Sequence, residues 1–174
     1  MLGFLFKDGY VALIQKNRPD WQKGKLNGIG GHIEEGETPD QAMEREFYEE
    51  TGALVSWQFY CAMEFPEAIV YCYKSFPSSG VFLRKTTDEI PDWYNYNALP
   101  ENVISNLNWL IPLALQKEEY MTHIHLSATL ATAMPIKRVE LPENPQLDHN
   151  RMYFAVEAYK AEIAKQGELF RRVK

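Results

Sequence analysis

Acidic side chains crowd one short stretch of the chain. Eight carboxylates lie between Glu34 and Glu50, and Arg45 is the one cation among them. Glu46, Glu49 and Glu50 are related by spacings of three and four residues, so a helix would place them on one face. Carboxylate oxygens are the ligands that Mg²⁺ and Mn²⁺ prefer, and the lack of Cys or His among the three disfavours zinc. The spacing therefore predicts a site for a divalent cation, although most charge runs are solvated helix faces.

The energetics of such a helix favour the cation site over the solvated face. Like charges one turn apart destabilise a helix by about 0.2–0.5 kcal/mol per pair, and the helix dipole disfavours acids in the last turns. Arg45 can reach Glu49, whereas no cation stands one turn from Glu50. An external cation would relieve both unfavourable effects.

The residues around the acids specify the helix that must carry them. Thr38 is a good N-cap, Gln41 completes a capping box with it, and Pro39 suits the first helical position. Gly52 supplies a stop, so we predict a helix from Pro39 to Thr51. The apolar stripe of this helix consists of Ala42, Met43 and Phe47.

Residues 31–53, called the box below, resemble the signature of the Nudix hydrolase family, the MutT-like pyrophosphohydrolases. That signature reads Gly, five residues, Glu, seven residues, then Arg-Glu-U-x-Glu-Glu-x-Gly-U, where U is a bulky aliphatic residue. Phe47 and Ala53 depart mildly at the two U positions, which pack rather than react, and Ile29 replaces a common proline in the preceding loop. The residues in register are Gly31, Glu37, Arg45, Glu46, Glu49, Glu50 and Gly52.

The resemblance implies a metal-dependent reaction at the box. Glu46, Glu49 and Glu50 would be ligands of Mg²⁺ or Mn²⁺, and the carbonyl of Gly30 would be a backbone ligand. Hydrolysis of a phosphoric anhydride needs its negative charge neutralised, which the metal supplies, and a carboxylate that accepts a proton from water. Either Glu46 or Glu49 would be that base, and the sequence does not choose between them.

The resemblance also assigns supporting roles. Arg45 would orient the acids of the helix through a salt bridge with Glu37 from the loop, so both count as catalytic residues. Gly31 would bind substrate, because a glycine lets the backbone approach a phosphate closely.

Three residues outside the box are further candidates. Glu89 is expected to follow the last strand, where many family members place another metal ligand or base, although most loop acids are only solvated. Lys25 offers charge to a phosphate, yet single loop lysines normally face solvent. Trp93 could stack on a nucleobase, whereas such aromatic residues more often cap a core.

The order of predicted elements matches the α/β/α sandwich with a mixed central sheet that the resemblance implies. Gly3–Phe6 and Tyr10–Gln15 flank Lys7-Asp8-Gly9, which predicts a hairpin. Beyond the box, hydrophobic patterns predict three further strands and a helix that Pro112 should kink or interrupt. The strands are expected over residues 55–63, 68–74 and 81–85, and the helix over residues 101–116.

We predict a Nudix hydrolase domain over residues 1–120 and a C-terminal extension over residues 121–174, packed on or beside that domain. Apolar residues recur at helical spacing after Asp148, which predicts a terminal amphipathic helix. Its apolar stripe would pack on the core, form a homodimer contact or cover the substrate cleft.

Composition excludes several classes of function. The 174-residue chain carries a net charge of −6, which argues against binding of extended nucleic acid. No run of 18 apolar residues occurs, so we expect no membrane span. Cys61 and Cys72 are the only two cysteines, and we predict free buried thiols suited to a reducing cytoplasm.

Together these patterns predict a cytoplasmic, Mg²⁺- or Mn²⁺-dependent Nudix pyrophosphohydrolase that acts on a small-molecule nucleotide. The substrate would be a nucleoside triphosphate, favoured by a loose likeness of residues 88–100 to the branch that hydrolyses oxidised purine nucleoside triphosphates. The first alternative is a nucleoside diphosphate linked to another moiety, as in an ADP-ribose or nucleotide-sugar pyrophosphatase. The second is a non-catalytic nucleotide-sensing module, which the intact Glu46, Glu49 and Glu50 disfavour.

Overall fold

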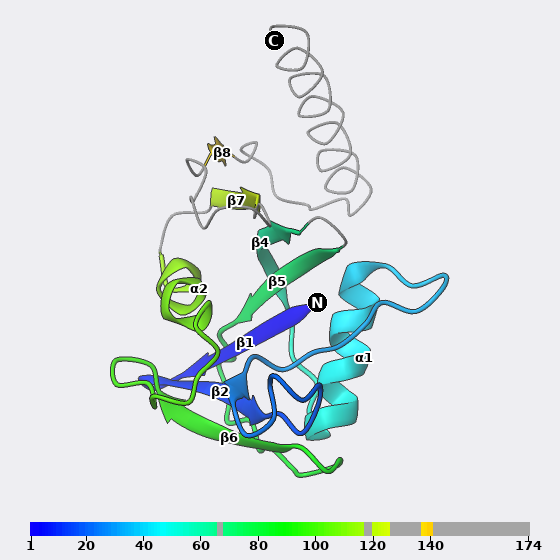
Figure 1. The fold of residues 1–174 in the computed structure, drawn as a ribbon, viewed down its shortest axis with the longest axis vertical. Helices are drawn as coiled ribbons and strands as arrows, with labels where there is room; N and C mark the ends of the chain where they lie inside the picture. Colours follow the sequence, from blue (N-terminus) through cyan, green and yellow to red (C-terminus); the bar gives the residue numbers. More distant parts are fainter. Residues whose placement is uncertain (66–67, 117–119, 126–136, 141–174) are drawn as a thin grey trace, which may run out of the picture. The chain divides into compact units, whose positions relative to one another are not determined.

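In the part of the chain that the structure describes, a mixed β-sheet of eight strands lies at the centre of the fold (Figure 1). The structure is a computed structural model, and it describes residues 1–65, 68–116, 120–125 and 137–140. The strands are β1 (Leu2–Lys7), β2 (Tyr10–Gln15), β3 (Leu26–Asn27), β4 (Gln58–Glu64), β5 (Ile69–Ser75), β6 (Ile90–Asn95), β7 (Tyr120–His125) and β8 (Lys137–Glu140).

The strand register brings the end of β2 to the start of β6. β2 pairs antiparallel with β1 and, along its whole length, with β6. β1 runs parallel to β5, which is antiparallel to β4, and β4 is followed by β7 and β8. Because Gln15 lies opposite Ile90, the next residue outward on β2 is Lys16 and the residue before β6 is Glu89. The two side chains therefore leave the sheet at the same place.

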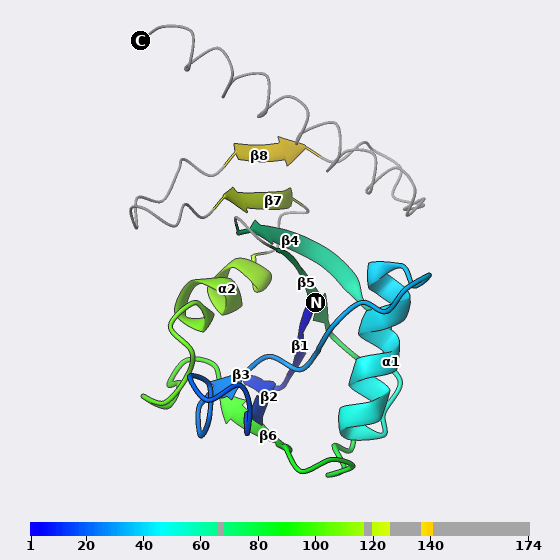
Figure 2. The same cartoon turned by 45° about the vertical axis from the view of Figure 1, so that its right-hand side comes forward.

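Of the two described helices, α1 covers one face of the sheet and α2 covers the other (Figure 2). Successive residues of a strand point to opposite faces, so neighbours on β1 and β2 enter different cores. Leu5 and Ala12 pack on the side of α1 (Pro39–Thr51), and Phe4 and Val11 on the side of α2 (Leu107–Ala114). This arrangement confirms the expected α/β/α sandwich.

The helix α1 has the bounds that its capping residues predict. The Thr38 hydroxyl accepts the Gln41 N–H at 3.3 Å, and the Gln41 side chain accepts the Thr38 N–H at 2.9 Å. Gly52 ends the helix with a left-handed φ of 67°. The predicted stripe of Ala42, Met43 and Phe47 is buried against the sheet. Local sequence therefore fixes both ends of α1 and the face it turns to the core.

Residues 81–85 do not form the predicted strand, and that prediction is wrong. The backbone N–H of Arg84 instead donates to the Thr51 carbonyl at 2.9 Å, and the Thr86 hydroxyl donates to the Glu49 carbonyl. The segment serves as a cap for the C-terminal end of α1, whose last carbonyls lack partners inside the helix.

β6 is one of the described strands that the sequence patterns did not predict, together with β3, β7 and β8, and its Pro91 concealed it. Proline cannot donate to a strand ladder, so it occurs mainly on edge strands. Among the described strands, β6 pairs with β2 alone, which leaves Pro91 on an edge. Glu89 therefore precedes a strand rather than following one, which corrects its predicted position.

Two other boundaries differ from the predictions by three residues or more. α2 begins at Leu107 rather than at residue 101, because the Ile104 N–H bonds to the Leu26 carbonyl and continues the β3 pairing. Pro112 lies inside α2, which runs on to Ala114. β4 begins at Gln58, three residues later than its alternating pattern suggested.

The remaining predictions concern the cysteines, the membrane and the C-terminal region. Cys61 and Cys72 lie opposite each other on β4 and β5 as free, buried thiols, as predicted. No helix within the described ranges is long and apolar enough to cross a membrane. Residues 120–125 and 137–140 form β7 and β8 of the same sheet, and the predicted terminal amphipathic helix lies outside the described residues.

Candidate functional site

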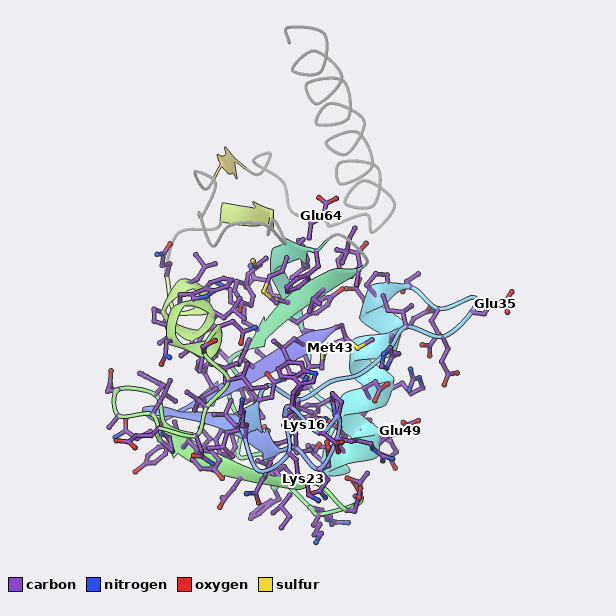
Figure 3. The ribbon with its side chains drawn as sticks, in the orientation of Figure 1. Lys16, Lys23, Glu35, Met43, Glu49 and Glu64 are labelled. Atoms are coloured by element: carbon purple, nitrogen blue, oxygen red, sulfur yellow. The ribbon has the colours of Figure 1, made fainter. Side chains whose placement is uncertain are left out.

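The three acids of α1 differ in how far they reach solvent. The side chain of Glu50 is 11% exposed, that of Glu46 is 17% exposed, and that of Glu49 is 55% exposed and extends outward from the helix (Figure 3). Glu46 and Glu50 therefore lie in the interior of the site and Glu49 at its rim. A carboxylate at the rim has free access to water, whereas the inner pair needs compensating donors or cations.

Arg45 holds the loop of the box against the helix. Its Nε donates to Glu37 Oε1 at 2.7 Å, and its Nη2 donates to Glu37 Oε2 at 3.0 Å and to the His32 carbonyl at 3.0 Å. This two-pronged geometry holds the pKa of Glu37 down at about 2. Nη1 also lies 3.3 Å from both Glu46 and Glu49. The structure thus brings together the salt bridge and the acids that the resemblance assigns to one site.

Arg45→Ala is expected to lower both stability and activity. The substitution removes the paired hydrogen bonds to Glu37, and the exposure of this pair keeps the loss of unfolding free energy modest. Activity should fall by about tenfold or more, since Glu46 and the loop lose their positioning contact. Urea melts and turnover assays would measure both effects. Arg45→Lys is the control: it keeps the charge without the fork. Melts of Arg45→Ala that match those of the wild type would contradict the bridge.

Two neighbouring glycines bring the loop up to the inner acids. The Gly30 N–H donates to Glu50 Oε2 at 3.1 Å. The carboxylate of Glu46 occupies the space beside Gly31, where a β-carbon would lie 2.3 Å from Glu46 Oε1. Glu46 and Glu50 therefore meet at the Gly30–Gly31 dipeptide, whose Gly30 carbonyl is the predicted backbone ligand.

A partly buried lysine bridges the inner acid of α1 to the acid before β6. Lys16 Nζ lies 3.8 Å from Glu50 Oε1 and makes a close ion pair with Glu89 Oε2. The other oxygen of Glu89 accepts the Asn17 N–H at 2.8 Å. Burial raises the pKa of Glu50 to about 7, despite the opposing effects of Lys16 and the Gly30 N–H. The structure thus places Glu89 beside the box acids, with an ammonium group between them.

The residues present fit a hard divalent cation, although the side chains are not gathered around one point. Among the described residues, no group of three or more Asp, Glu, His or Cys side chains is arranged to hold a metal ion. The acids are instead engaged by the cations Arg45 and Lys16. Every donor at the site is a carboxylate or carbonyl oxygen, as Mg²⁺ and Mn²⁺ require. The Lys16 ammonium group pairs with Glu50 and Glu89, and it supplies the positive charge that these two carboxylates require.

The remaining residues that were predicted to contact substrate are Lys25 and Trp93. Lys25 is exposed in the loop after β2. Trp93 lies on β6, opposite Ala12, and packs against the core cluster beneath α1. Stacking of a nucleobase on Trp93 stays a prediction.

Sequence reasoning missed Lys16. It stands alone after a strand, and its acidic partner Glu89 is 73 residues away in the chain. The one signal that points to Lys16 is the strand pairing of Gln15 with Ile90. This pairing could not be predicted because β6 was not predicted.

Comparison with known proteins connects this geometry to a family. Residues 2–124 match the NUDIX domain. An oxidized purine nucleoside triphosphate hydrolase of Danio rerio is 28% identical over 134 residues, which cover 69% of this chain and 81% of that protein. The protein of the same name from Mus musculus is 28% identical over 124 residues, which cover 64% of this chain and 76% of that protein.

Two solved structures show the same fold. The MutT NUDIX hydrolase of Burkholderia pseudomallei has a TM-score of 0.56 at 20% identity, and the match covers 64% of this chain and 93% of that one. The mMutator MutT protein of Bacillus halodurans has a TM-score of 0.57 at 18% identity, and the match covers 81% of this chain and 97% of that one.

Proposed function

The chain belongs to the Nudix family and is a hydrolase, and from this premise we propose that it hydrolyses a phosphoric anhydride bond of a nucleotide with Mg²⁺ or Mn²⁺. The observation that carries the proposal is the convergence of Glu46 and Glu50 on the Gly30–Gly31 dipeptide. The divalent ion, when bound, supplies positive charge that neutralises the diphosphate.

The residues of the site divide the remaining work. Glu46, Glu50 and the Gly30 carbonyl would hold the ion, with Glu89 as a further ligand. Arg45 positions the acids through its contacts. The exposure of Glu49 favours it over Glu46 as the acceptor of a proton from water.

We propose a purine nucleoside triphosphate, in the oxidised form that the Danio rerio and Mus musculus relatives are named for, as the substrate. Water would add to a phosphorus of the anhydride chain, the bridging P–O bond would break, and a nucleoside monophosphate and pyrophosphate would leave. A nucleoside diphosphate linked to another moiety is the second candidate, since the residues of the box would bind the diphosphate and not the attached group. The free thiols Cys61 and Cys72 suit a cytoplasmic location.

A nucleotide panel with identified products tests the proposal. Oxidised and normal purine nucleoside triphosphates, ADP-ribose and nucleotide sugars would each be incubated with the full chain and Mg²⁺. We expect release of a nucleoside monophosphate and pyrophosphate, fastest from an oxidised purine triphosphate. Faster turnover of ADP-ribose or a nucleotide sugar would move the substrate assignment to the second candidate. Binding of a nucleotide without any turnover would instead indicate a sensing module.

A further inference from the structure

Lys16 is placed as the counter-cation of two buried acids. Its side chain is 15% exposed, against 11% for Glu50 and 5% for Glu89. A buried carboxylate needs a compensating charge or several hydrogen bonds to remain ionised. Among the described residues, a backbone N–H donates to each acid, that of Gly30 to Glu50 and that of Asn17 to Glu89. Lys16 Nζ lies between the two oxygens that remain.

The backbone on both sides holds Lys16 in this position. Its N–H donates to the Lys25 carbonyl at 2.9 Å, and its carbonyl accepts the Gly24 N–H at 2.8 Å. β2 fixes the residue before it, because Gln15 pairs with both β3 and β6. The backbone of Lys16 is therefore fixed, whereas its side chain has four rotatable bonds through which the ammonium group can leave the acids.

A divalent ion and this ammonium group would use the same oxygens. Two positive charges held about 4 Å apart in a partly buried site repel each other strongly enough to weaken binding of one by up to roughly three orders of magnitude. We propose that Lys16 is the resident counter-cation of Glu50 and Glu89 and that it competes with the divalent ion for them, an inference that rests on the metal site of the proposed function. Lys16 thereby keeps the metal-free protein folded and weakens its affinity for the metal.

Titration of the full chain with Mn²⁺ at about pH 8, without nucleotide, tests the competition directly. Lys16→Met removes the charge and keeps the length of the stem. We expect this variant to bind Mn²⁺ about tenfold tighter than the wild type, or more. Lys23→Met makes the same change of charge at an exposed lysine in the neighbouring loop (Figure 3) and should bind Mn²⁺ as the wild type does.

Thermal melts give a second measurement on the same proteins. Without metal, Lys16→Met should melt several degrees below the wild type, because two buried acids lose their counter-charge. Saturating Mn²⁺ should raise its melting temperature by more than that of the wild type, since ion binding to the folded state stabilises it. A purely structural lysine would lower the first melting temperature without tightening the binding of Mn²⁺.

A measurement on the wild type covers the case in which Lys16→Met does not fold. Brief acetylation followed by peptide mass spectrometry reports the reactivity of each lysine. Mn²⁺ should raise the labelling of Lys16 and leave that of Lys23 unchanged. Two outcomes would overturn the proposed competition and leave the proposed metal site intact. One is labelling of Lys16 that does not change when the protein binds Mn²⁺, and the other is an affinity of Lys16→Met for Mn²⁺ no tighter than that of the wild type. Failure of the wild type to bind Mn²⁺ at all overturns the proposed metal site as well.

Discussion

Glu50→Gln is expected to lower turnover by about two orders of magnitude or more while the protein stays folded. Glu50 is the most buried acid of α1, and its Oε2 is held by the Gly30 N–H. An amide of the same shape can keep that hydrogen bond, but it is a weaker ligand for a divalent cation and carries no charge. Steady-state turnover with Mg²⁺ and a nucleotide that the wild type hydrolyses would measure the loss.

The same substitution should change how stability depends on pH. Burial raises the pKa of Glu50 from 4.5 to about 7, so the folded metal-free protein binds more protons than the unfolded chain between these values. Stability from this group is therefore lost as the pH rises from about 4.5 to about 7, and Glu50→Gln should abolish that loss. Melts of both proteins without metal across this range would show it.

Glu44→Gln is the matched control for Glu50→Gln, because it makes the same change at an exposed acid of the same helix that occupies a variable position of the signature. It should retain turnover close to that of the wild type. Wild-type kinetics for Glu50→Gln would show that the reaction does not need the Glu50 carboxylate. That result would contradict the assignment of the metal ligands.

Gly31→Ala should impair activity by about tenfold or more with little effect on stability, whereas Gly30→Ala should destabilise the fold. A β-carbon on Gly31 would lie 2.3 Å from Glu46 Oε1, so the flexible end of that side chain must move. A β-carbon on Gly30 would lie 2.6 Å from the Met1 carbonyl oxygen, at a φ of +148° that strains any residue with a side chain. The backbone around Gly30 cannot move aside as the Glu46 side chain can. We therefore expect Gly30→Ala to lose roughly 3 kcal/mol of unfolding free energy.

Thermal melts and turnover of the two glycine variants separate positioning of Glu46 from folding of the loop. Gly31→Ala with wild-type turnover would show that the position of the Glu46 carboxylate does not matter to the reaction. Mn²⁺ affinity measured on the same variant tells whether the displaced acid is a ligand or a base. A lost ligand weakens binding, whereas a displaced base leaves it unchanged.

The sequence was sufficient where short-range contacts decide the structure. The bounds of α1 follow from Thr38, Gln41 and Gly52, which act within one helical turn of each end. The bridge from Arg45 to Glu37 spans eight residues and was readable from the signature. These local features are sufficient to place the acids on one face of the helix.

Contacts between distant segments account for the parts that could not be predicted. β6 was missed because Pro91 contradicts a strand unless its edge position is known. The strand predicted over residues 81–85 instead caps α1 through Arg84. The role of Lys16 depends on the pairing of β2 with β6, and no pattern near Lys16 in the chain reports that pairing.

Because Thr38, Gln41 and Gly52 fix the bounds of α1, residues 37–52 form a transferable segment, which would lose only the donors that Arg84 and Thr86 supply to its last carbonyls. Grafted onto another sheet, this segment should keep its helical phase and its bridge from Arg45 to Glu37, because both arise within it. It would leave behind Lys16 and Glu89, which come from the end of β2 and the start of β6. A recipient scaffold would therefore carry the acids at the same spacing but would lack Lys16, which we propose lowers their affinity for a divalent ion.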